Sequence, residues 1–342
     1  MFMNEKKLKT IVEHLYQKDF DGMIIKDMNN MGYISNYFPT AFAICLLKED
    51  PIIYTRSMDL ELAEATSDIE VKTFKSLKDL KEILKKENHE KIAIEKTLDI
   101  ETYQKISGEY ELTISDLLEK ERMIKTSDEI AKIKKATEIA HKSFIELIDD
   151  VETKKFSELT MAYKLGQSLR DNGAESESFD TIFTSGSSTS LPHSIPGNNK
   201  IDYPILVDWG AKYHRYCSDT TRTIIYNKKE EEIFDIVLEA YTKTIKAIKP
   251  GIKSNELDKI ARDIITEHGY GENFIHSTGH SLGLDIHENP IIAFNNETTI
   301  EKDMIITIEP GIYLKERFGV RIEDTIHVTN KGEVIGNLNP VL

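Results

Sequence analysis

Four acidic residues end or interrupt apolar, strand-like segments in the second half of this chain. Asp208 lies within "ILVDWG", Asp219 within "CSDTTRT", Glu309 at the end of "MIITIE" and Glu323 within "GVRIEDTIHV". A carboxylate in an apolar strand is costly unless it is paired or binds a metal. Each of these residues alone is typical of a capped or ion-paired position. The four together predict a fold that brings their carboxylates to one place.

Two of these segments are close enough in sequence to pair. Residues 205–210 and 216–225 predict a hairpin through "AKYHRY". Such a hairpin would place Asp219 in mid-strand and let its carboxylate approach that of Asp208.

The last segment has an alternating pattern. Alternation along a strand puts Arg321 and Glu323 on one face and Val320 and Ile322 on the other face or at its edge.

Converging carboxylates would repel one another and raise their pKa values, and divalent cations relieve that repulsion. An oxygen-rich ligand set with one imidazole suits Mn²⁺, Co²⁺, Fe²⁺ or Zn²⁺, and the ligand types do not choose among these ions. Two ions about 3.5–4 Å apart can share bridging carboxylates and activate water. The pattern therefore predicts a hydrolase centre.

The segment "FIHSTGHSLGLDIHENP", residues 274–290, contains three histidines and no lysine or arginine. His276 and His280 are four residues apart, as in a helical zinc motif, but the glycines around His280 break a helix and no HExxH is present. Those glycines let the backbone approach closely, which favours His280 as the metal ligand. His276 is interpreted as a hydrogen-bonded residue, and His287 lies where a turn begins.

A fourth histidine, His193, lies in the Gly/Ser-rich segment "TSGSSTSLPHS". Such loops often border functional sites. The alternative is a histidine that is merely exposed on a loop.

With 342 residues, the chain is long enough for two domains. Residues 1–122 alternate the short strands "DGMIIK", "AFAICLL" and "PIIYT" with amphipathic segments such as 77–88, and the loop "YISNYFPT" joins the first two of these strands. This pattern predicts an α/β domain. A helix beginning near Ser127 opens the second domain, residues 123–342, whose separate runs of helices and strands predict an α+β fold with a largely antiparallel sheet.

Composition limits the possible partners and the compartment. The 59 acidic and 44 basic residues give a net charge of −15, which argues against a nucleic-acid partner. The two cysteines, Cys45 and Cys217, cannot form a disulfide framework. Neither a signal peptide nor a stretch of membrane-spanning length is evident, so a cytoplasmic location without membrane association is expected.

The motifs "VDWGAKYHRYCSDTTRT", "HSTGHSLGLDIHE", "TIEPGIY" and "GVRIEDT" resemble, in order and spacing, metallopeptidases of the creatinase or pita-bread family, above all Xaa-Pro dipeptidases (prolidases) and aminopeptidases P. The resemblance extends over the whole chain. It implies a creatinase-like α/β N-terminal domain, an α+β pita-bread catalytic domain, and often a homodimer.

The resemblance also implies a ligand set for two divalent ions per subunit, with Mn²⁺ or Co²⁺ ahead of Zn²⁺ or Fe²⁺. Asp208 would bind one ion, Asp219 and Glu323 would bridge both, and His280 and Glu309 would complete the second.

Catalytic roles are implied in the same way. His193 and His287 would contact the scissile carbonyl before proline, and Glu309 would shuttle a proton. Arg321 would steady the acidic cluster. The expected substrate is a proline-containing dipeptide or short peptide.

The sequence departs from many prolidases in two places. "HENPIIAFNN" has Ile291 and Ile292 where an arginine often binds the dipeptide carboxylate, and "YISNYFPT" lacks a histidine found in some relatives. The short N-terminal domain favours a dipeptidase nonetheless.

Four alternatives to the dipeptidase are considered. An aminopeptidase P acting on longer peptides is the first, and a non-catalytic pita-bread binding module is the alternative of another class. Methionine aminopeptidases usually lack the N-terminal domain, and metal-free creatinase-like amidinohydrolases lack the ligands.

Overall fold

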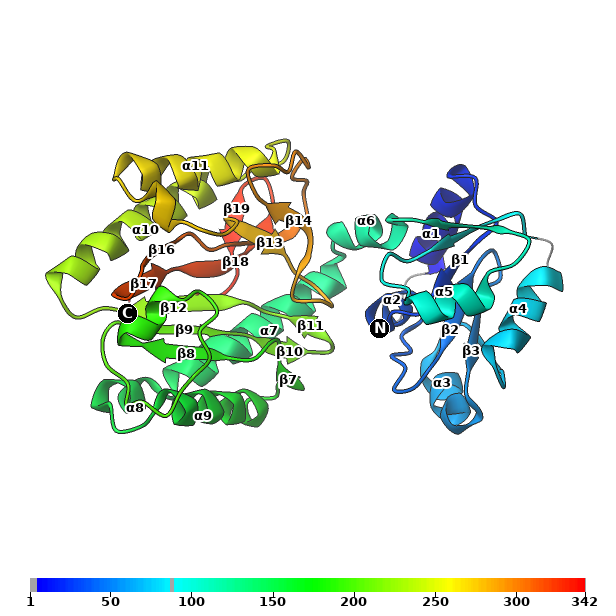
Figure 1. Ribbon diagram of the computed structural model, residues 1–342, viewed down its shortest axis with the longest axis horizontal. Coiled ribbons are helices and arrows are strands. Elements are labelled where there is room, and N and C mark those ends of the chain that lie inside the picture. The colour runs from blue at the N-terminus through cyan, green and yellow to red at the C-terminus, as the bar shows by residue number, and fades with distance from the viewer. Residues whose placement is uncertain (1–4, 87–88, 342) are drawn as a thin grey trace. The chain divides into compact units, whose positions relative to one another are not determined.

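The computed structural model describes residues 5–86 and 89–341, and the chain divides into two compact units, Met1–Arg122 and Met123–Leu342 (Figure 1). Each unit has its own hydrophobic core. Among the described residues, no helix has the length and apolar character needed to cross a membrane.

The first unit is an α/β domain around a six-stranded sheet with strand order β4-β3-β2-β1-β5-β6. The strands are β1 (Gly22–Ile25), β2 (Ile44–Leu47), β3 (Ile52–Thr55), β4 (Glu70–Thr73), β5 (Lys91–Ile94) and β6 (Glu111–Ile114). The helices are α1 (Glu5–Gln17), α2 (Met28–Ser35), the short 3₁₀ helix η1 (Ser57–Asp59), α3 (Leu60–Thr66), α4 (Leu77–Lys86), α5 (Ile100–Ile106) and α6 (Leu117–Met123). The predicted strands are confirmed, as is the predicted helix over 77–86, and its positions 87–88 lie outside the described residues.

One prediction for this unit is wrong in part. The segment "YISNYFPT" was expected to be a loop, but its first residues belong to α2. Asp27 caps this helix, because its side chain accepts hydrogen bonds from the backbone N–H groups of Asn29 and Asn30.

The second unit contains an antiparallel sheet of eight strands in the order β14-β13-β15-β18-β12-β9-β8, with β19 paired to β18. Two small sheets, β11-β10-β7 and β16-β17, accompany it. The strands are β7 (Ser176–Glu177), β8 (Ile182–Ser185), β9 (Ile205–Trp209), β10 (Ala211–Tyr213), β11 (Tyr216–Cys217), β12 (Thr220–Ile224), β13 (Gly279–Ser281), β14 (Glu288–Ile292), β15 (Ile305–Ile308), β16 (Gly311–Leu314), β17 (Phe318–Arg321), β18 (Glu323–Val328) and β19 (Gly332–Val334). The predicted α+β character and antiparallel pairing are confirmed.

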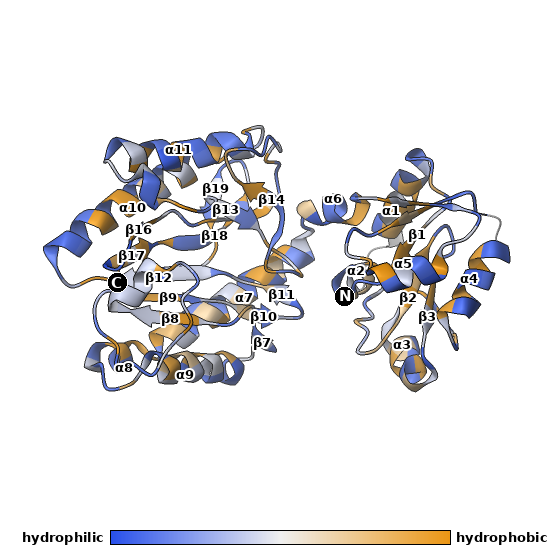
Figure 2. Ribbon diagram, viewed as in Figure 1, coloured by the Kyte–Doolittle hydropathy of each residue, from blue (hydrophilic) through white to orange (hydrophobic). Residues whose placement is uncertain are grey.

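Helices cover the large sheet in two groups. They are α7 (Ser127–Ile145), α8 (Ile148–Thr153), α9 (Glu158–Asp171), α10 (Lys228–Ala247) and α11 (Ser254–Glu267), with the 3₁₀ helices η2 (Gly186–Ser190) and η3 (Gly271–Asn273). One apolar core joins α7 and α9 to β8 and β9, and another joins α10 and α11 to β15 and β18. In Figure 2 the ribbon of α10 alternates between hydrophobic and hydrophilic residues, as expected for a helix with one apolar face.

The helix that opens the second unit begins with a capping box. The Thr126 side chain accepts from the Glu129 backbone N–H, and the Glu129 carboxylate accepts from the Thr126 N–H. The capping residue is therefore one position before the predicted Ser127. Further along α7, Phe144 stacks on Trp209 of β9 with ring centroids 4.5 Å apart, which fixes the helix on the sheet.

A buried arginine joins β12 to β18. The Arg222 side chain is fully buried, and its guanidinium donates to the backbone carbonyls of Thr221 at 2.9 Å and Glu323 at 2.6 Å. It also binds the Asp324 carboxylate at 2.8 Å and the Leu338 carbonyl at 2.7 Å. These bonds fix the backbone on both sides of Glu323.

Acid should weaken the second unit through His141 on α7. Burial, with the charge of Arg222, lowers the pKa of His141 to about 3. A depressed folded-state pKa gives stability that is complete above the unfolded value of about 6.5 and is lost as the pH falls toward the folded value. The free energy of unfolding should therefore fall by about 2 kcal/mol more in wild type than in His141→Gln between pH 7.5 and 4.5.

Urea unfolding of both metal-stripped proteins at the two pH values measures this difference. The two proteins differ only at residue 141, so contributions from other groups cancel in the comparison. If the difference in free energy of unfolding between wild type and His141→Gln were the same at both pH values, protonation of His141 would not be a source of acid instability.

Candidate metal centre

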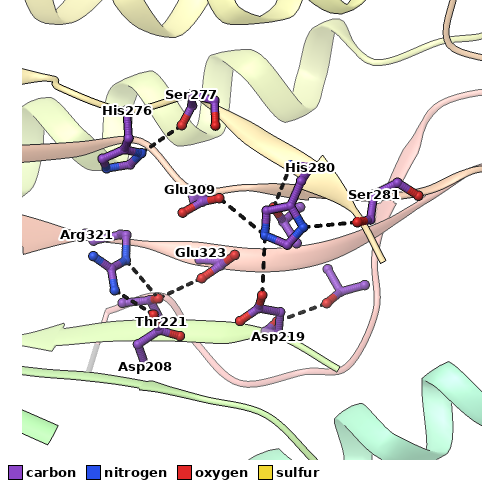
Figure 3. Close-up of polar contacts among 12 residues, drawn as sticks. Asp208, Asp219, Thr221, His276, Ser277, His280, Ser281, Glu309, Arg321 and Glu323 are labelled. Atoms are coloured by element: carbon purple, nitrogen blue, oxygen red, sulfur yellow. Dashed lines mark hydrogen bonds and ion pairs between the residues drawn. The ribbon is translucent and has the colours of Figure 1, made fainter. Parts of the chain in front are cut away.

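The predicted ligands come from five separate pieces of the second unit. Asp208 lies in β9, Asp219 between β11 and β12, His280 in β13, Glu309 directly after β15 and Glu323 at the start of β18. Figure 3 shows these five side chains in one group, with Arg321 at its edge.

The hairpin carrying the two aspartates differs from the expectation in one respect. Strands β9 and β12 pair, and the residue opposite Asp208 is Thr221. Asp219 is not in mid-strand, because Ser218 and Asp219 form a break between β11 and β12. The hairpin is confirmed, and the position of Asp219 within a strand is wrong. Freed from the ladder, the Asp219 side chain can turn toward the other acids.

Arg321 connects two of the acidic residues. Its Nη2 donates to Asp208 Oδ2 at 2.6 Å, and its Nε donates to Thr221 Oγ1 at 3.1 Å. Thr221 Oγ1 in turn donates to Glu323 Oε2 at 2.7 Å (Figure 3). Arg321 and Glu323 therefore face the same region, while Val320 and Ile322 belong to the hydrophobic core, as the alternation predicts.

The local structure leaves one nitrogen of His280 available for a ligand. His280 Nδ1 donates to the Ser281 carbonyl at 3.0 Å, which leaves Nε2 as the unprotonated nitrogen. Nε2 lies 3.5 Å from Asp219 Oδ2 and 3.5 Å from Glu309 Oε1. Burial lowers the pKa of His280 to about 4, so at neutral pH the ring is in the neutral form that binds metals. A side chain at Gly279 would meet the Thr307 carbonyl, so glycine is required for this close approach of β13 and β15.

Three carboxylate oxygens of the cluster are buried without a hydrogen-bond partner among the described residues: Asp208 Oδ1, Asp219 Oδ1 and Glu323 Oε1. Buried polar atoms normally have a partner, and leaving one without costs about 1–3 kcal/mol.

The negative charges of the clustered carboxylates repel one another. Burial first, then the charges of Glu323, Asp208 and Glu309, raise the pKa of Asp219 well above its usual range. Burial, then Glu309 and Asp208, do the same to the pKa of Glu323. Burial and Asp208, opposed by Arg321, raise the pKa of Glu309 to about 8. Divalent cations would satisfy both the unpartnered oxygens and these charges, so the donor set fits a metal centre.

The tightest group in the cluster consists of Asp219, His280 and Glu323, whose ligand atoms all lie within 4.8 Å of one another. Glu309 joins this group through its contact with His280. Asp208 joins it through Arg321 and Thr221. All five predicted ligands are thus brought into one connected set.

His276 belongs to a hydrogen-bond chain beside this set. Its Nδ1 donates to the Ser277 carbonyl at 2.8 Å, and its Nε2 is 2.9 Å from the Tyr313 hydroxyl. Tyr313 accepts from Arg321 Nη1 at 2.8 Å, so its own proton is directed to His276. Both ring nitrogens of His276 are occupied, which agrees with its interpretation as a hydrogen-bonded residue.

The two other predicted histidines are exposed and lie on connecting segments. His193 follows Pro192, whose carbonyl accepts from Arg321 Nη1 at 3.3 Å. The ring of His287 is 4.5 Å from that of His280, centroid to centroid. Burial first, and then the charge of His193, lower the pKa of His287, and the charge of Asp208 opposes this shift.

The turn that carries His287 is tied to the sheet by a buried ion pair. Lys125 Nζ lies 3.2 Å from Glu288 Oε2 and donates to Ser281 Oγ at 3.0 Å. Glu288 also accepts from the backbone N–H of Asp285 at 3.1 Å. These contacts fix the turn between His280 and His287.

Comparison with known proteins agrees with this geometry. Residues 131–330 match the model of metallopeptidase family M24, and residues 7–124 match that of the creatinase/prolidase N-terminal domain. The chain belongs to metallopeptidase family M24. A Xaa-Pro dipeptidase from Pyrococcus furiosus is 39% identical over 338 residues, which cover 96% of each chain.

Solved structures of other proteins resemble this chain over nearly its whole length. A prolidase from Pyrococcus horikoshii has a TM-score of 0.92 at 37% identity and covers 98% of this chain and 99% of its own. An X-Pro aminopeptidase from Thermotoga maritima has a TM-score of 0.84 at 32% identity, covering 94% and 97%. The predicted creatinase-like N-terminal domain, pita-bread catalytic domain and prolidase-like metallopeptidase are confirmed.

Sequence reasoning missed two residues of this M24 centre. Thr221 joins Arg321 to Glu323, and Tyr313 joins Arg321 to His276. Both lie within motifs that had been identified, two residues after Asp219 and four after Glu309. Neither is acidic or imidazole-bearing, so a search for metal ligands passes over them.

Replacing Asp219 by Asn should stabilise the metal-free enzyme and abolish its response to metal. Asn has nearly the same shape but removes one of the mutually repelling charges. The midpoint of thermal unfolding of metal-free protein should rise by about 2–4 °C. Added Mn²⁺ should raise the midpoint of wild type and leave that of Asp219→Asn unchanged.

Asp235→Asn is the matched control, because Asp235 is exposed on α10. This control should respond to Mn²⁺ like wild type. A metal-dependent shift retained in Asp219→Asn would remove Asp219 from the ligand set.

Proposed function

We propose that this M24 enzyme is a Xaa-Pro dipeptidase that binds two divalent ions through Asp208, Asp219, His280, Glu309 and Glu323. The observation that carries the proposal is that three buried carboxylate oxygens without a hydrogen-bond partner among the described residues belong to the same connected set of side chains as the neutral His280. Similarity over almost the full chain to a Xaa-Pro dipeptidase from Pyrococcus furiosus supports the choice of substrate. We propose Mn²⁺ or Co²⁺ as the bound ions, with Zn²⁺ or Fe²⁺ as the alternatives.

In this proposal Asp208 would hold one ion, His280 and Glu309 would hold the other, and both would share Asp219 and Glu323. Bound divalent ions would supply Lewis-acid polarisation of the scissile carbonyl and would lower the pKa of water. Arg321 holds Asp208 directly and Glu323 through Thr221, so the acids keep their positions when the ions leave.

Proton transfer is assigned to Glu309. Its carboxylate projects from the end of β15 and contacts His280 on one side. It would accept the proton of the attacking water and deliver it to the proline nitrogen. This delivery matters because the proline nitrogen, a tertiary amide nitrogen without an N–H, must gain a proton to leave as an amine when its bond to the carbonyl carbon breaks.

His193 and His287 are assigned to the substrate carbonyl. The lowered pKa of His287 keeps its imidazole neutral at neutral pH, with one N–H available to donate. A donor from His193 or His287 would stabilise the negative charge that develops on the carbonyl oxygen. The predicted homodimer and cytoplasmic location stay predictions.

The substrate class is tested with three peptides. Metal-stripped enzyme restored with Mn²⁺ or Co²⁺ should hydrolyse Ala-Pro and leave Ala-Pro-Ala and Ala-Ala intact, as measured by release of free alanine. Ala-Ala is the control for the proline requirement. Cleavage of Ala-Pro-Ala would move the enzyme to the aminopeptidase P class, in keeping with Ile291 and Ile292 where an arginine often binds a dipeptide carboxylate.

The bridging role is tested with Glu323→Ala. Removing a ligand to both ions should lower turnover of Ala-Pro by more than about 10²-fold and lower the bound metal per subunit. Metal content is measured by mass spectrometry after desalting. Glu333→Ala, at an exposed position of β19, is the control and should keep both properties. Near-normal turnover in Glu323→Ala would show that the bridging assignment is wrong.

A further inference from the structure

The loop that carries His193 is anchored at both ends by one buried side chain. This loop follows β8 and covers residues 186–197. Glu158, the first residue of α9, is 2% exposed. Its carboxylate accepts hydrogen bonds from residues at the two ends of the loop, Ser185 and Gly197.

The bonds from Glu158 divide between its two oxygens. Oε1 accepts from the backbone N–H of Ser185 at 2.8 Å and from Ser185 Oγ at 2.8 Å. Oε2 accepts from the backbone N–H of Gly197 at 3.0 Å. The backbone strengthens the second end, because Leu159 N–H donates to the Gly197 carbonyl at 2.9 Å. One carboxylate therefore holds residues twelve positions apart in the sequence close together.

The middle of the loop is anchored separately, at the metal centre. Arg321 donates to the Pro192 carbonyl, and the Gly319 backbone N–H donates to Thr189 Oγ1 at 2.9 Å. His193 directly follows Pro192 and is itself exposed. With the middle fixed by Arg321 and the ends fixed by Glu158, the backbone beside His193 has little freedom to move.

We propose that Glu158 is a positioning residue that fixes the His193 loop for catalysis, an inference that rests on the role of His193 in the proposed function. Glu158 does not touch the metal ligands; it acts through the ends of the loop.

The chemistry requires a carboxylate at this position. All three partners of Glu158 are donors, and an ionised carboxylate offers only acceptors. Its negative charge at the first turn of the 14-residue helix α9 is also favoured by the helix dipole. A glutamine would turn one acceptor into an NH₂ group facing an N–H donor, so one end of the loop would lose its bond.

The test compares Glu158→Gln with wild type in hydrolysis of Ala-Pro. We expect kcat to fall by about 10²-fold through misplacement of His193, with KM and bound metal unchanged. Hydrogen exchange followed by mass spectrometry should show faster exchange in residues 186–197. Should Glu158→Gln fail to fold, Ser185→Ala removes one of the three donors and should lower kcat less, in the same direction.

Ser157→Ala is the matched control. Ser157 caps the same helix by accepting from the Thr160 N–H at 3.2 Å, but its side chain does not bond to the loop. This variant should lose stability without losing kcat. An equal loss of kcat in Ser157→Ala would show that Glu158 acts only through the stability of α9 and would overturn the proposal.

A double-mutant cycle with His193→Ala separates positioning from a general structural role. If Glu158 acts through His193, Glu158→Gln should lower kcat no further in the His193→Ala background. An equal fold-loss in both backgrounds would overturn the proposal, as would wild-type kcat in Glu158→Gln. Undiminished kcat in His193→Ala alone would instead refute the role proposed for His193, and with it the catalytic purpose of the anchor.

Discussion

The catalytic unit depends on carboxylates that are crowded into a site of low dielectric. Arg321 is the cation that contacts the cluster, and it is bonded to Asp208 and, through Thr221, to Glu323. Its single charge opposes the rise in the pKa of Asp219, Glu309 and Glu323 without cancelling it. The free energy that burial of these charges costs is recovered when cations bind, so affinity for metal and strain in the metal-free protein have one origin.

The candidate site combines residues on the strands of the large sheet with residues on the segments that connect them. The five proposed metal ligands lie on strands or at their ends, and two groups of helices pack against those strands through separate cores. His193 and His287 are exposed and lie on a loop and a turn. Each of these segments is fastened by a buried acid, Glu158 for the loop and Glu288 for the turn. Hydrogen bonds and ion pairs that hold these segments therefore fix the positions of the side chains they carry.

The sequence predicted the α/β and α+β character of the two units, the antiparallel pairing and the convergence of the acidic side chains with His280. These features follow from local pattern: alternation, helical spacing, and acids in apolar segments. The break at Asp219 was missed because nothing in "CSDTTRT" distinguishes a strand from two strands separated by two residues. The segment "YISNYFPT" was assigned to a loop, although its first three residues end a helix that Asp27 caps at the other end.

The supporting residues could not be found in the same way. Tyr313 and Thr221 have common side chains whose importance lies in the partner that strand register gives them. The same holds for Glu158. In the sequence it is an ordinary acidic residue in the first turn of a helix, and only the structure shows its hydrogen bonds to the two ends of the loop. Long-range pairing is a property of the whole fold, and single-sequence periodicity does not report it.

The centre is held together by contacts between residues that are far apart in the sequence, and this affects when the enzyme can become active. Arg321 and Asp208 are 113 residues apart in sequence, and Arg222, behind the centre, holds carbonyls of Leu338 and Asn339. Closing such distant contacts is slow compared with forming helices, so the centre is completed late in folding. A ribosome that has translated the chain only as far as α11 carries no Glu309, Arg321 or Glu323, and hence no peptidase. Synthesis itself therefore delays hydrolysis until the catalytic unit is almost entirely made.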